Sequence, residues 1–389
     1  MKILYITLED MSLHKGSVIH TKEVIERLQG RGYQVGLMAM ASGPYEGSGP
    51  FYNLHMRALG RKKSYVIASL LLFLFLFRYL SRYRVLYARD FHTVIIALLP
   101  RVLFNRKLVF EINGIAHEEQ RLKSSSWLNQ FLSFFIKISE KLACRYSDRI
   151  VSVTPQICNY LIRYFRCRSD KIEVVGNGVD TRRFRPIEQG RLLLDYRKRF
   201  GISKGDITVA FVGNIAFWQG VDILLNSALP LLSKDGYLKF LVVGDGLLKD
   251  PLVKKVLDAG YEKNVIFAGM VRYEDIPFII NIADICVAPF IARRNRVTGV
   301  SPLKVFEYMA CGKPVICSRI EGLEFVETER AGYLVEPEDI KDLQEKLVDL
   351  IHDPGKRAAM GREGLHLVRE KFDWGLKVTK IEKILKALA

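Results

Sequence analysis

Short apolar runs alternate with stretches of helical periodicity along most of the chain. In the first half, runs rich in Val, Ile and Leu lie at residues 2–7, 34–40, 85–88, 108–112, 150–153 and 172–175. In the second half, they lie at residues 207–213, 240–244, 265–269, 285–290, 314–318 and 332–335. Unbroken apolar strands separated by helices are typical of parallel sheets covered on both faces. The pattern therefore predicts two doubly wound, Rossmann-like α/β domains.

Length and turn signals predict where these domains begin and end. A chain of 389 residues has room for two domains of ordinary size. We expect a first domain at residues 1–186, a turn-rich linker at 187–206, a second domain at 207–370 and a final segment at 371–389. The final segment is predicted to be an amphipathic helix, because its apolar residues recur every three or four positions.

Charge is distributed unevenly between the two halves. The chain has a formal net charge of +17, and residues 1–186 hold 29 Lys and Arg against 14 Asp and Glu. Such asymmetry predicts an anionic partner for the first half, either nucleic acid or an anionic membrane leaflet. The basic half carries no RRM, KH or zinc-finger signature, which argues against nucleic acid. We therefore expect an anionic membrane surface and no nucleic acid.

The most apolar stretch is VIASLLLFLFLF at residues 66–77. Twelve helical residues span about 18 Å, short of the roughly 30 Å hydrocarbon core, so a transmembrane helix is not expected. Cations flank the stretch on both sides: Arg57, Arg61, Lys62, Lys63, Arg78, Arg82 and Arg84. Residues 57–84 are therefore predicted to form a buried crossover helix, an interfacial membrane helix, or both. A second candidate for membrane contact is the aromatic-rich segment 127–146.

Cysteine use and the first residues bear on the compartment. The six cysteines form no C-x-x-C pair and no metal-ligand spacing, which predicts free thiols in a reducing compartment and no metal site. The first residues run into an apolar strand without a secretory signal pattern. We expect a cytoplasmic protein that is peripheral on the cytoplasmic face of the membrane.

Loops that follow strands are candidate anion sites, because ligands of open α/β sheets bind at the carboxyl ends of strands. Gly16 and Ser17 open a helix after the first strand, and Gly213 and Gly244 follow strands of the second domain. None of these loops is a full G-x-G-x-x-G, and the Gly-Lys pair of ACGKPV lacks the rest of a P-loop. A dinucleotide or ATP site is therefore not expected.

The segment RRNRVTGVSPLKVFEYMACGKPV, residues 293–315, combines cations with a helix start. Ser301 is expected at the N-cap and Pro302 at the first helical position. The free backbone amides that would then face a ligand are those of Leu303, Lys304 and Val305.

Lys304 and Glu307 are the charged side chains on this helix. Lys304 would add a cation, and Glu307, one turn later, could accept two hydroxyls as from a ribose. The alternative is an ordinary capped helix with an i,i+3 Lys–Glu pair.

Three ordered motifs resemble those of the retaining glycosyltransferases of family four. They are VVGNGVDTRRFRP at 174–186, FVGNIAFWQGVDILL at 211–225 and SPLKVFEYMACGKPVICSRIEG at 301–322. The resemblance implies the GT-B fold, with two facing doubly wound domains, a cleft between them and a terminal helix that crosses back to the first domain. It implies that the second domain binds a nucleotide-diphosphate sugar, that the first receives the acceptor, and that neither metal nor cofactor is required.

The chain departs from the family's pattern at several positions. Gly299 stands where the family has the first Glu of Glu-x7-Glu, and Asn214 and Gln219 stand where it has a phosphate-binding Arg and Lys. We hypothesise that Lys304 supplies the missing charge, together with one of three arginines. These are Arg293, Arg294 and Arg296.

In the first domain, Asn113 occupies the place of a family histidine, with Glu111, His117 and Glu118 nearby. The catalytic candidates are therefore Asn113, Glu111 and Lys304. The Gly16 and Ser17 amides, the 301–305 helix start and Lys304 are expected to stabilise the leaving diphosphate.

These observations together predict sugar transfer from a nucleotide-diphosphate donor to a membrane-associated acceptor, either lipid-linked or a glycan. Retention of configuration is implied by the resemblance alone. Two alternatives stay open: a GT-B sugar-nucleotide epimerase, and a non-catalytic protein that binds sugar nucleotides or acts as a scaffold.

Overall fold

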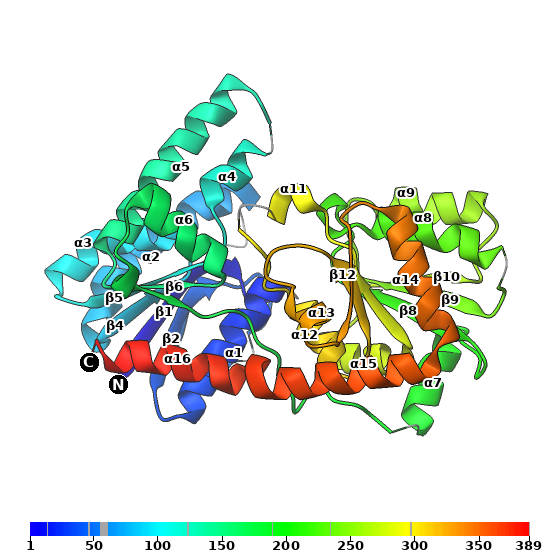
Figure 1. Cartoon of the computed structure of the whole chain (residues 1–389). Coiled ribbons are helices and arrows are strands. Elements are labelled where there is room, and N and C mark those ends of the chain that lie inside the picture. Colours follow the sequence, from blue (N-terminus) through cyan, green and yellow to red (C-terminus); the bar gives the residue numbers. More distant parts are fainter. Residues whose placement is uncertain are drawn as a thin grey trace. The chain divides into compact units, whose positions relative to one another are not determined.

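The computed structural model describes the chain except residues 14, 46, 55–60, 123, 189, 234, 296–297 and 389; the side chains of 61–65 and 294 also lie outside the described part. The chain divides into two compact units (Figure 1). The first comprises Met1–Asn177, Val297–Gly299 and Trp374–Ala389, and the second comprises Gly178–Arg296 and Val300–Asp373.

The first unit is built on a seven-stranded parallel sheet. Its strands are β1 (Lys2–Asp10), β2 (Gln34–Met40), β3 (Phe51–Asn53), β4 (Val85–Ala88), β5 (Lys107–Ile112), β6 (Arg149–Ser152) and β7 (Ile172–Val174). Their order is β3-β2-β1-β4-β5-β6-β7, so the strand order reverses between β1 and β4. Ile3 of β1 pairs with Val35 on one side and Val85 on the other. Such a reversal opens a crevice at the carboxyl ends of the strands.

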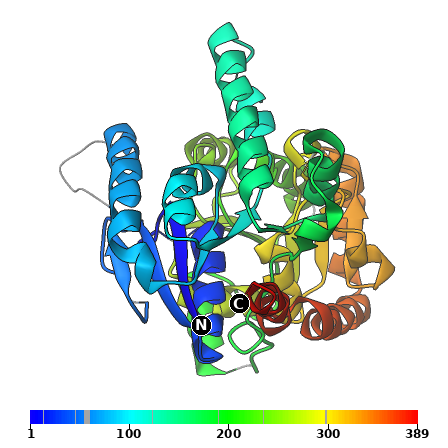
Figure 2. The same ribbon diagram turned by 90° about the vertical axis from the view of Figure 1, so that its left-hand side faces the viewer.

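Helices cover both faces of this sheet (Figures 1 and 2). They are α1 (Gly16–Gly30), α2 (Arg61–Tyr79), α3 (Phe91–Leu103), α4 (Ala116–Arg121), α5 (Trp127–Tyr146), α6 (Pro155–Phe165) and α16 (Trp374–Lys386), with 3-10 turns η1 (Leu80–Arg82) and η2 (Ser169–Lys171). Helix α16 packs on α1, where Arg31 forms an ion pair of 2.8 Å with Glu382. The predicted final helix therefore joins the first unit.

The second unit is built on a six-stranded parallel sheet in the order β10-β9-β8-β11-β12-β13. The strands are β8 (Ile207–Val212), β9 (Leu238–Val243), β10 (Val265–Gly269), β11 (Ile285–Ala288), β12 (Val315–Ser318) and β13 (Gly332–Val335). Alternate residues of β8 enter two separate cores, Ala210 and Val212 on one face and Val209 and Phe211 on the other. This two-sided burial confirms the expectation drawn from the unbroken apolar runs.

The helical elements of the second unit follow its strands in alternation. They are α7 (Arg191–Arg199), α8 (Val221–Leu232), α9 (Lys249–Asp258), α10 (Ile276–Ile282), α11 (Ala292–Asn295), α12 (Leu303–Ala310), α13 (Phe325–Thr328), α14 (Ile340–His352) and α15 (Pro354–Leu367). Short turns complete the set: η3 (Phe217–Gln219), η4 (Tyr273–Asp275) and η5 (Val368–Phe372).

The unit boundary differs from the one predicted. The units separate between Asn177 and Gly178, earlier in the chain than residue 186. Residues 187–206 are part of the second unit rather than a linker, because Tyr196 of α7 stacks on Phe278 of α10 with ring centroids 5.5 Å apart. Every predicted apolar run contains a strand, but β3, a three-residue edge strand, was not predicted.

Helix α2 holds the most apolar stretch of the chain. It buries Ala68, Leu72 and Leu76 completely in the core of the first unit. The prediction of a buried crossover helix is therefore confirmed. Among the described residues, no helix has both the length and the apolar character needed to cross a bilayer. Arg57 and the side chains of Arg61, Lys62 and Lys63 lie outside the described residues.

Candidate functional site

Lys304 is held at the point where the strand order of the second sheet reverses. It is the second residue of α12, which follows β11, and its Nζ donates a 2.7 Å hydrogen bond to Oε1 of Gln219 in η3, after β8. Nζ also lies 3.9 Å from the ring centroid of Phe211 at the end of β8. The structure therefore brings the Lys304 ammonium group to the side chain of Gln219, the residue that the resemblance aligns with the family's lysine.

Tyr308 fixes helix α12 against the end of β8. Its hydroxyl accepts a 2.8 Å hydrogen bond from the backbone N–H of Val212 and donates to the carbonyl of the same residue at 3.3 Å. Tyr308 is fully buried and lies one turn after Lys304 on the same helix face. The position of Lys304 is thus set by a helix whose next turn is bonded to the sheet.

The glycines of the two neighbouring loops allow this close packing. A Cβ on Gly213, which has φ of 150°, would lie 2.6 Å from Nζ of Lys304. A Cβ on Gly244, with φ of 131°, would overlap the carbonyl oxygen of Gly213. Asn214 is exposed in the same loop. Both glycines predicted from the sequence therefore stand where a side chain would collide with the site.

The electrostatic setting of Lys304 favours an anion. Burial lowers the pKa of Lys304 to about 7, while the negative charge of Glu307 acts in the opposite direction. The partner of the ammonium group is the neutral amide of Gln219. A phosphate would supply the counter-charge, and charge-assisted hydrogen bonds are about twice as strong as neutral ones.

Glu307 is buried one turn into α12, where its Oε1 accepts a 3.0 Å hydrogen bond from the hydroxyl of Tyr273. Lys304 and Glu307 thus also bond to different elements, η3 and η4, in addition to the effect of the Glu307 charge on Lys304. Glu307 keeps a carboxylate next to the predicted phosphate position.

The predicted cap of α12 is wrong by one residue. Pro302 is itself the N-cap, with an extended backbone (φ −83°, ψ 118°), and Ser301 precedes it. Proline has no N–H to lose, so it can stand on either side of the helix start. The first helical residues are still Leu303, Lys304 and Val305, as expected, and α12 has no side-chain cap bond.

The remaining positions concern the region where the chain differs from the family's motif. Gly299 has φ of 61°, a backbone conformation that favours glycine, and a Cβ there would require the Gln156 side chain to move. Arg293 is exposed on α11. The side chain of Arg294 and all of Arg296 lie outside the described residues, so their part in anion binding stays a prediction.

A second polar cluster surrounds Glu111, the fully buried carboxylate near the end of β5. Oε2 accepts a 2.6 Å hydrogen bond from the Tyr87 hydroxyl, and Oε1 accepts one of 3.2 Å from the Asn113 side chain. Oε1 also lies 2.9 Å from Nε2 of His20 and 3.3 Å from Nε of Arg89. Burial alone would raise the pKa of Glu111, but the charges and hydrogen bonds of His20, Arg89 and Tyr87 lower it to about 2.

This cluster separates the two catalytic candidates of the first domain. Asn113 is exposed, whereas Glu111 is fully buried and holds His20 and Arg89 in place. Glu111 is therefore a positioning residue in this structure, and Asn113 is the candidate that can touch a ligand. Neither His20 nor Arg89 was singled out from the sequence, although Arg89 directly follows a strand.

The start of α1 is joined to the same cluster. Gly16 and Ser17 are the first two residues of this helix, as expected, and no side chain caps it. The guanidinium of Arg89 donates to the carbonyl of Ser17 and, at 2.8 Å, to the hydroxyl of Thr21. Helix α1 and the ends of β4 and β5 thus form one connected group at the carboxyl edge of the first sheet.

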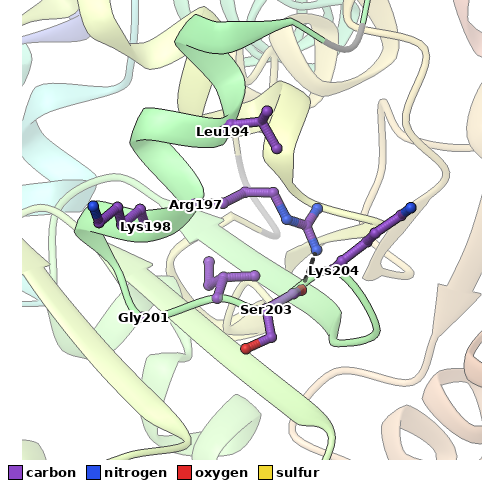
Figure 3. Close-up of a pocket in the computed structure, with 7 residues that line it drawn as sticks. Leu194, Arg197, Lys198, Gly201, Ser203 and Lys204 are labelled. Carbon is purple, nitrogen blue, oxygen red and sulfur yellow. Dashed lines mark hydrogen bonds between the residues drawn. The ribbon is translucent and has the colours of Figure 1, made fainter.

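A pocket of about 660 Å³ lies elsewhere in the second unit (Figure 3). It is lined by Leu194, Arg197, Lys198, Gly201, Ile202, Ser203 and Lys204. Arg197 donates to the carbonyl of Ser203 at 2.9 Å, the bond drawn in Figure 3. The residues that line the pocket come just before β8 in the chain, so the pocket lies at the amino edge of the sheet. Ligands of such sheets bind at the carboxyl edge. Among the described residues, no cluster of His, Cys, Asp or Glu could hold a metal ion.

Comparison with known families covers both units. Residues 14–183 match the model described as Glycosyltransferase Family 4, and residues 206–353 match the model described as Glycosyl transferases group 1. The chain carries glycosyltransferase family 4 and group 1 domains.

Two relatives show how far the sequence similarity extends. The D-inositol 3-phosphate glycosyltransferase of Rhodococcus jostii is 28% identical over 246 residues, which cover 61% of this chain and 52% of the relative. A GDP-mannose-dependent monoacylated alpha-(1-6)-phosphatidylinositol monomannoside mannosyltransferase of Corynebacterium glutamicum is 28% identical over 242 residues, covering 61% and 62%. The chain thus spans less than two thirds of the length of these glycosyltransferase relatives.

Solved structures establish the fold. Sucrose-phosphate synthase from Thermosynechococcus elongatus superposes with a TM-score of 0.82 at 19% identity, covering 100% of this chain and 98% of the other. The Anabaena protein HepE, solved in complex with UDP, superposes with a TM-score of 0.78 at 19% identity, covering 100% of both chains. The predicted GT-B fold is confirmed.

Proposed function

We propose that this protein is a glycosyltransferase that moves a sugar from a nucleotide-diphosphate donor to a membrane-associated acceptor, lipid-linked or glycan, with retention. The observation that carries the proposal is the hydrogen bond between Lys304 and Gln219. This bond holds the Lys304 ammonium group beside Gln219, the residue that stands where the family has a phosphate-binding lysine. This arrangement favours a glycosyltransferase domain whose phosphate-binding cation comes from α12 over a domain that no longer binds the donor.

The donor is assigned to the second unit. Lys304 and the first amides of α12 would hold the diphosphate, because a helix start and a cation both favour anions. Gly213 leaves room for the phosphate to approach the backbone, and Glu307 would accept the ribose hydroxyls. During transfer the diphosphate leaves with growing negative charge, which the same groups stabilise.

The acceptor is assigned to the first unit. Asn113 would contact the sugar or the acceptor, and Glu111 would hold Asn113 in place through their hydrogen bond. The backbone amides of Gly16 and Ser17 would, as predicted, stabilise the leaving diphosphate. The two relatives act on inositol 3-phosphate and on a phosphatidylinositol mannoside, which suits a phosphorylated or lipid acceptor for this chain. Residues 57–84 and 127–146 would meet an anionic membrane on its cytoplasmic face.

Transfer can be tested with radiolabelled sugars on UDP, GDP and ADP, mixed with the full chain and a bacterial lipid extract. We expect one donor to yield a labelled, solvent-extractable product together with stoichiometric nucleoside diphosphate. Release of a free altered sugar without any acceptor would instead support the epimerase. Nucleotide binding with no product from any donor or acceptor would support the non-catalytic alternative.

Replacement of Gly213 by alanine should weaken nucleoside-diphosphate binding by about tenfold, because the new Cβ would displace the Lys304 ammonium group. Calorimetric titration measures the loss. The matched control is Gly260→Ala, which also has positive φ (75°) but has nothing within 4 Å of its Cβ position. Equal binding by wild type and Gly213→Ala would show that the Lys304 position is not part of the donor site.

A further inference from the structure

Helix α5 packs in the opposite sense to an ordinary surface helix. The residues that it buries include Asn129, Ser133 and Glu140, which lie on one face at helical spacing. A helix on a soluble protein normally buries its apolar stripe and exposes its polar face.

Hydrogen bonds to α4 fix this orientation. The carboxylate of Glu140 accepts a 2.7 Å hydrogen bond from the backbone N–H of Ala116 and lies 2.5 Å from Nδ1 of His117. The Ser133 hydroxyl donates to the carbonyl of His117 at 2.9 Å. The Asn129 side chain donates to the carbonyl of Gln120 at 2.8 Å. These buried polar groups would lose their partners if the helix rotated, so the apolar face must point outward.

The outward face of α5 carries large apolar side chains. They are Trp127, Leu128, Phe131, Leu132, Phe134, Phe135, Ile138 and Leu142. Trp127 is 78% exposed, Phe131 54% and Phe134 58%. Most of these residues lie in the amino-terminal half of α5, which projects beyond the other helices of the first unit (Figures 1 and 2). An exposed apolar surface of this kind marks an interaction site.

Charge identifies the partner. Lys137, Lys141 and Arg145 are exposed at helical spacing along one flank of α5, and its single acid, Glu140, is buried. A second copy would bring like charges together, whereas an anionic lipid surface would complement them. Aromatic residues on one face with cations beside them are typical of interfacial membrane helices.

The neighbouring helices also expose apolar side chains. Helix α3 contacts both α5 and α2, so the three form one layer over the sheet. Val102 and Leu103 of α3 are exposed near its carboxyl end, and Val66, Leu70 and Leu74 of α2 are exposed at helical spacing. Helix α2 uses its other side for the core, whereas α5 leaves nearly all its large side chains uncovered.

We propose that the amino-terminal half of α5 inserts into the interface of an anionic lipid bilayer, with the outer faces of α3 and α2 lying against the same membrane. The inference deepens the proposed function and rests on it for the placement of a membrane-bound acceptor. It assigns insertion to α5 and makes α2, the most apolar segment, a secondary contact.

Binding of the full chain to vesicles tests this assignment. Wild-type protein should co-sediment with phosphatidylcholine–phosphatidylglycerol vesicles, more weakly with phosphatidylcholine alone, and more weakly in high salt. The variant Phe131→Ser/Phe134→Ser should lose about tenfold or more in partitioning, because two buried aromatic contacts with lipid are removed. The matched control is Leu247→Ser/Met270→Ser, which removes two exposed apolar side chains of the second unit and should bind like wild type.

Quenching by brominated lipids provides a second readout. Trp127 should be quenched on vesicles, and Trp127→Phe should remove that quenching while keeping most of the binding. The other two tryptophans are Trp374, which is buried, and Trp218, which is half-buried in the second unit. The proposal would be overturned if the Phe131→Ser/Phe134→Ser variant bound vesicles as strongly as wild type. It would also be overturned if wild type did not bind vesicles but self-associated, and this variant did not self-associate. The vesicles contain neither donor nor acceptor, so failure here is distinct from failure of sugar transfer.

Discussion

Replacement of Lys304 by methionine should lower kcat/KM for sugar transfer by about 10²- to 10³-fold, the effect of removing one preorganised group that stabilises a leaving oxyanion. Methionine keeps the length and apolar stem of the side chain against Phe211 and removes only the charge. The protein should therefore fold as wild type does. Transfer kinetics measure the loss in kcat/KM, and nucleotide titration measures how much of that loss comes from weaker nucleotide binding.

The same lysine should make nucleotide binding depend on pH. Burial holds the pKa of Lys304 at about 7, so the unliganded protein loses this ammonium group above neutrality. A diphosphate prefers the protonated form of Lys304, so nucleotide affinity should fall as the pH rises from about 6.5 to 8.5. In the Lys304→Met variant, the affinity should depend much less on pH.

Lys313 supplies the control, as a second lysine of the same unit whose pKa is lowered by burial. Its Nζ bonds to the carbonyl of Asn281, and it precedes β12, at the amino edge of the sheet. Lys313→Met should leave nucleotide affinity and its pH dependence unchanged. An equal loss in both variants would show that the effect comes from the fold rather than from the site.

Replacement of Glu111 by glutamine should reduce the free energy of unfolding of the first unit by about 3–5 kcal/mol, because Arg89 would be left buried without its counter-charge and His20 would lose the carboxylate beside it. Urea denaturation followed by tryptophan fluorescence measures the change, since Trp374 lies 5.0 Å from His20. Glu382→Gln breaks the partly exposed ion pair with Arg31 and should change the free energy by less than about 1 kcal/mol.

The stabilisation by Glu111 should also depend on pH. Its pKa is about 2 in the folded state, below the ordinary value of 4.5, so the unfolded chain takes up this proton first. The contribution is complete above pH 4.5 and is lost as the pH falls towards 2. The difference in stability between wild type and Glu111→Gln should therefore shrink over that range. A constant difference would contradict the charged state assigned to Glu111.

The strands were predictable because unbroken apolar runs between helical stretches are typical of strands buried on both faces of a parallel sheet. The exception is β3, Phe51–Asn53, which is an edge strand too short to leave a periodic signal. The cap of α12 was misplaced because Ser301 and Pro302 are both favoured at a helix start, and local preference does not settle which residue turns first.

Long-range contacts account for the parts of the sites that the sequence did not reveal. His20, Arg89 and Glu111 come from a helix and two strand ends far apart in the chain, and their grouping follows from the strand order. For α5, the sequence shows aromatic residues and cations, but the face that turns inward is decided by the bonds of Glu140 to α4. Lys304 was predictable because the helix start and the charge lie next to each other in sequence.

In our proposal, the carboxyl edge of the second sheet binds a nucleoside diphosphate through α12. Calorimetric titration of UDP, GDP and ADP into wild type and Glu307→Ala tests it most directly. We predict that one of the three binds wild type, and that the Glu307→Ala variant binds it about tenfold or more weakly, because a charged acceptor for the ribose hydroxyls is lost. Absence of binding by all three, or equal affinity in the variant, would contradict the claim.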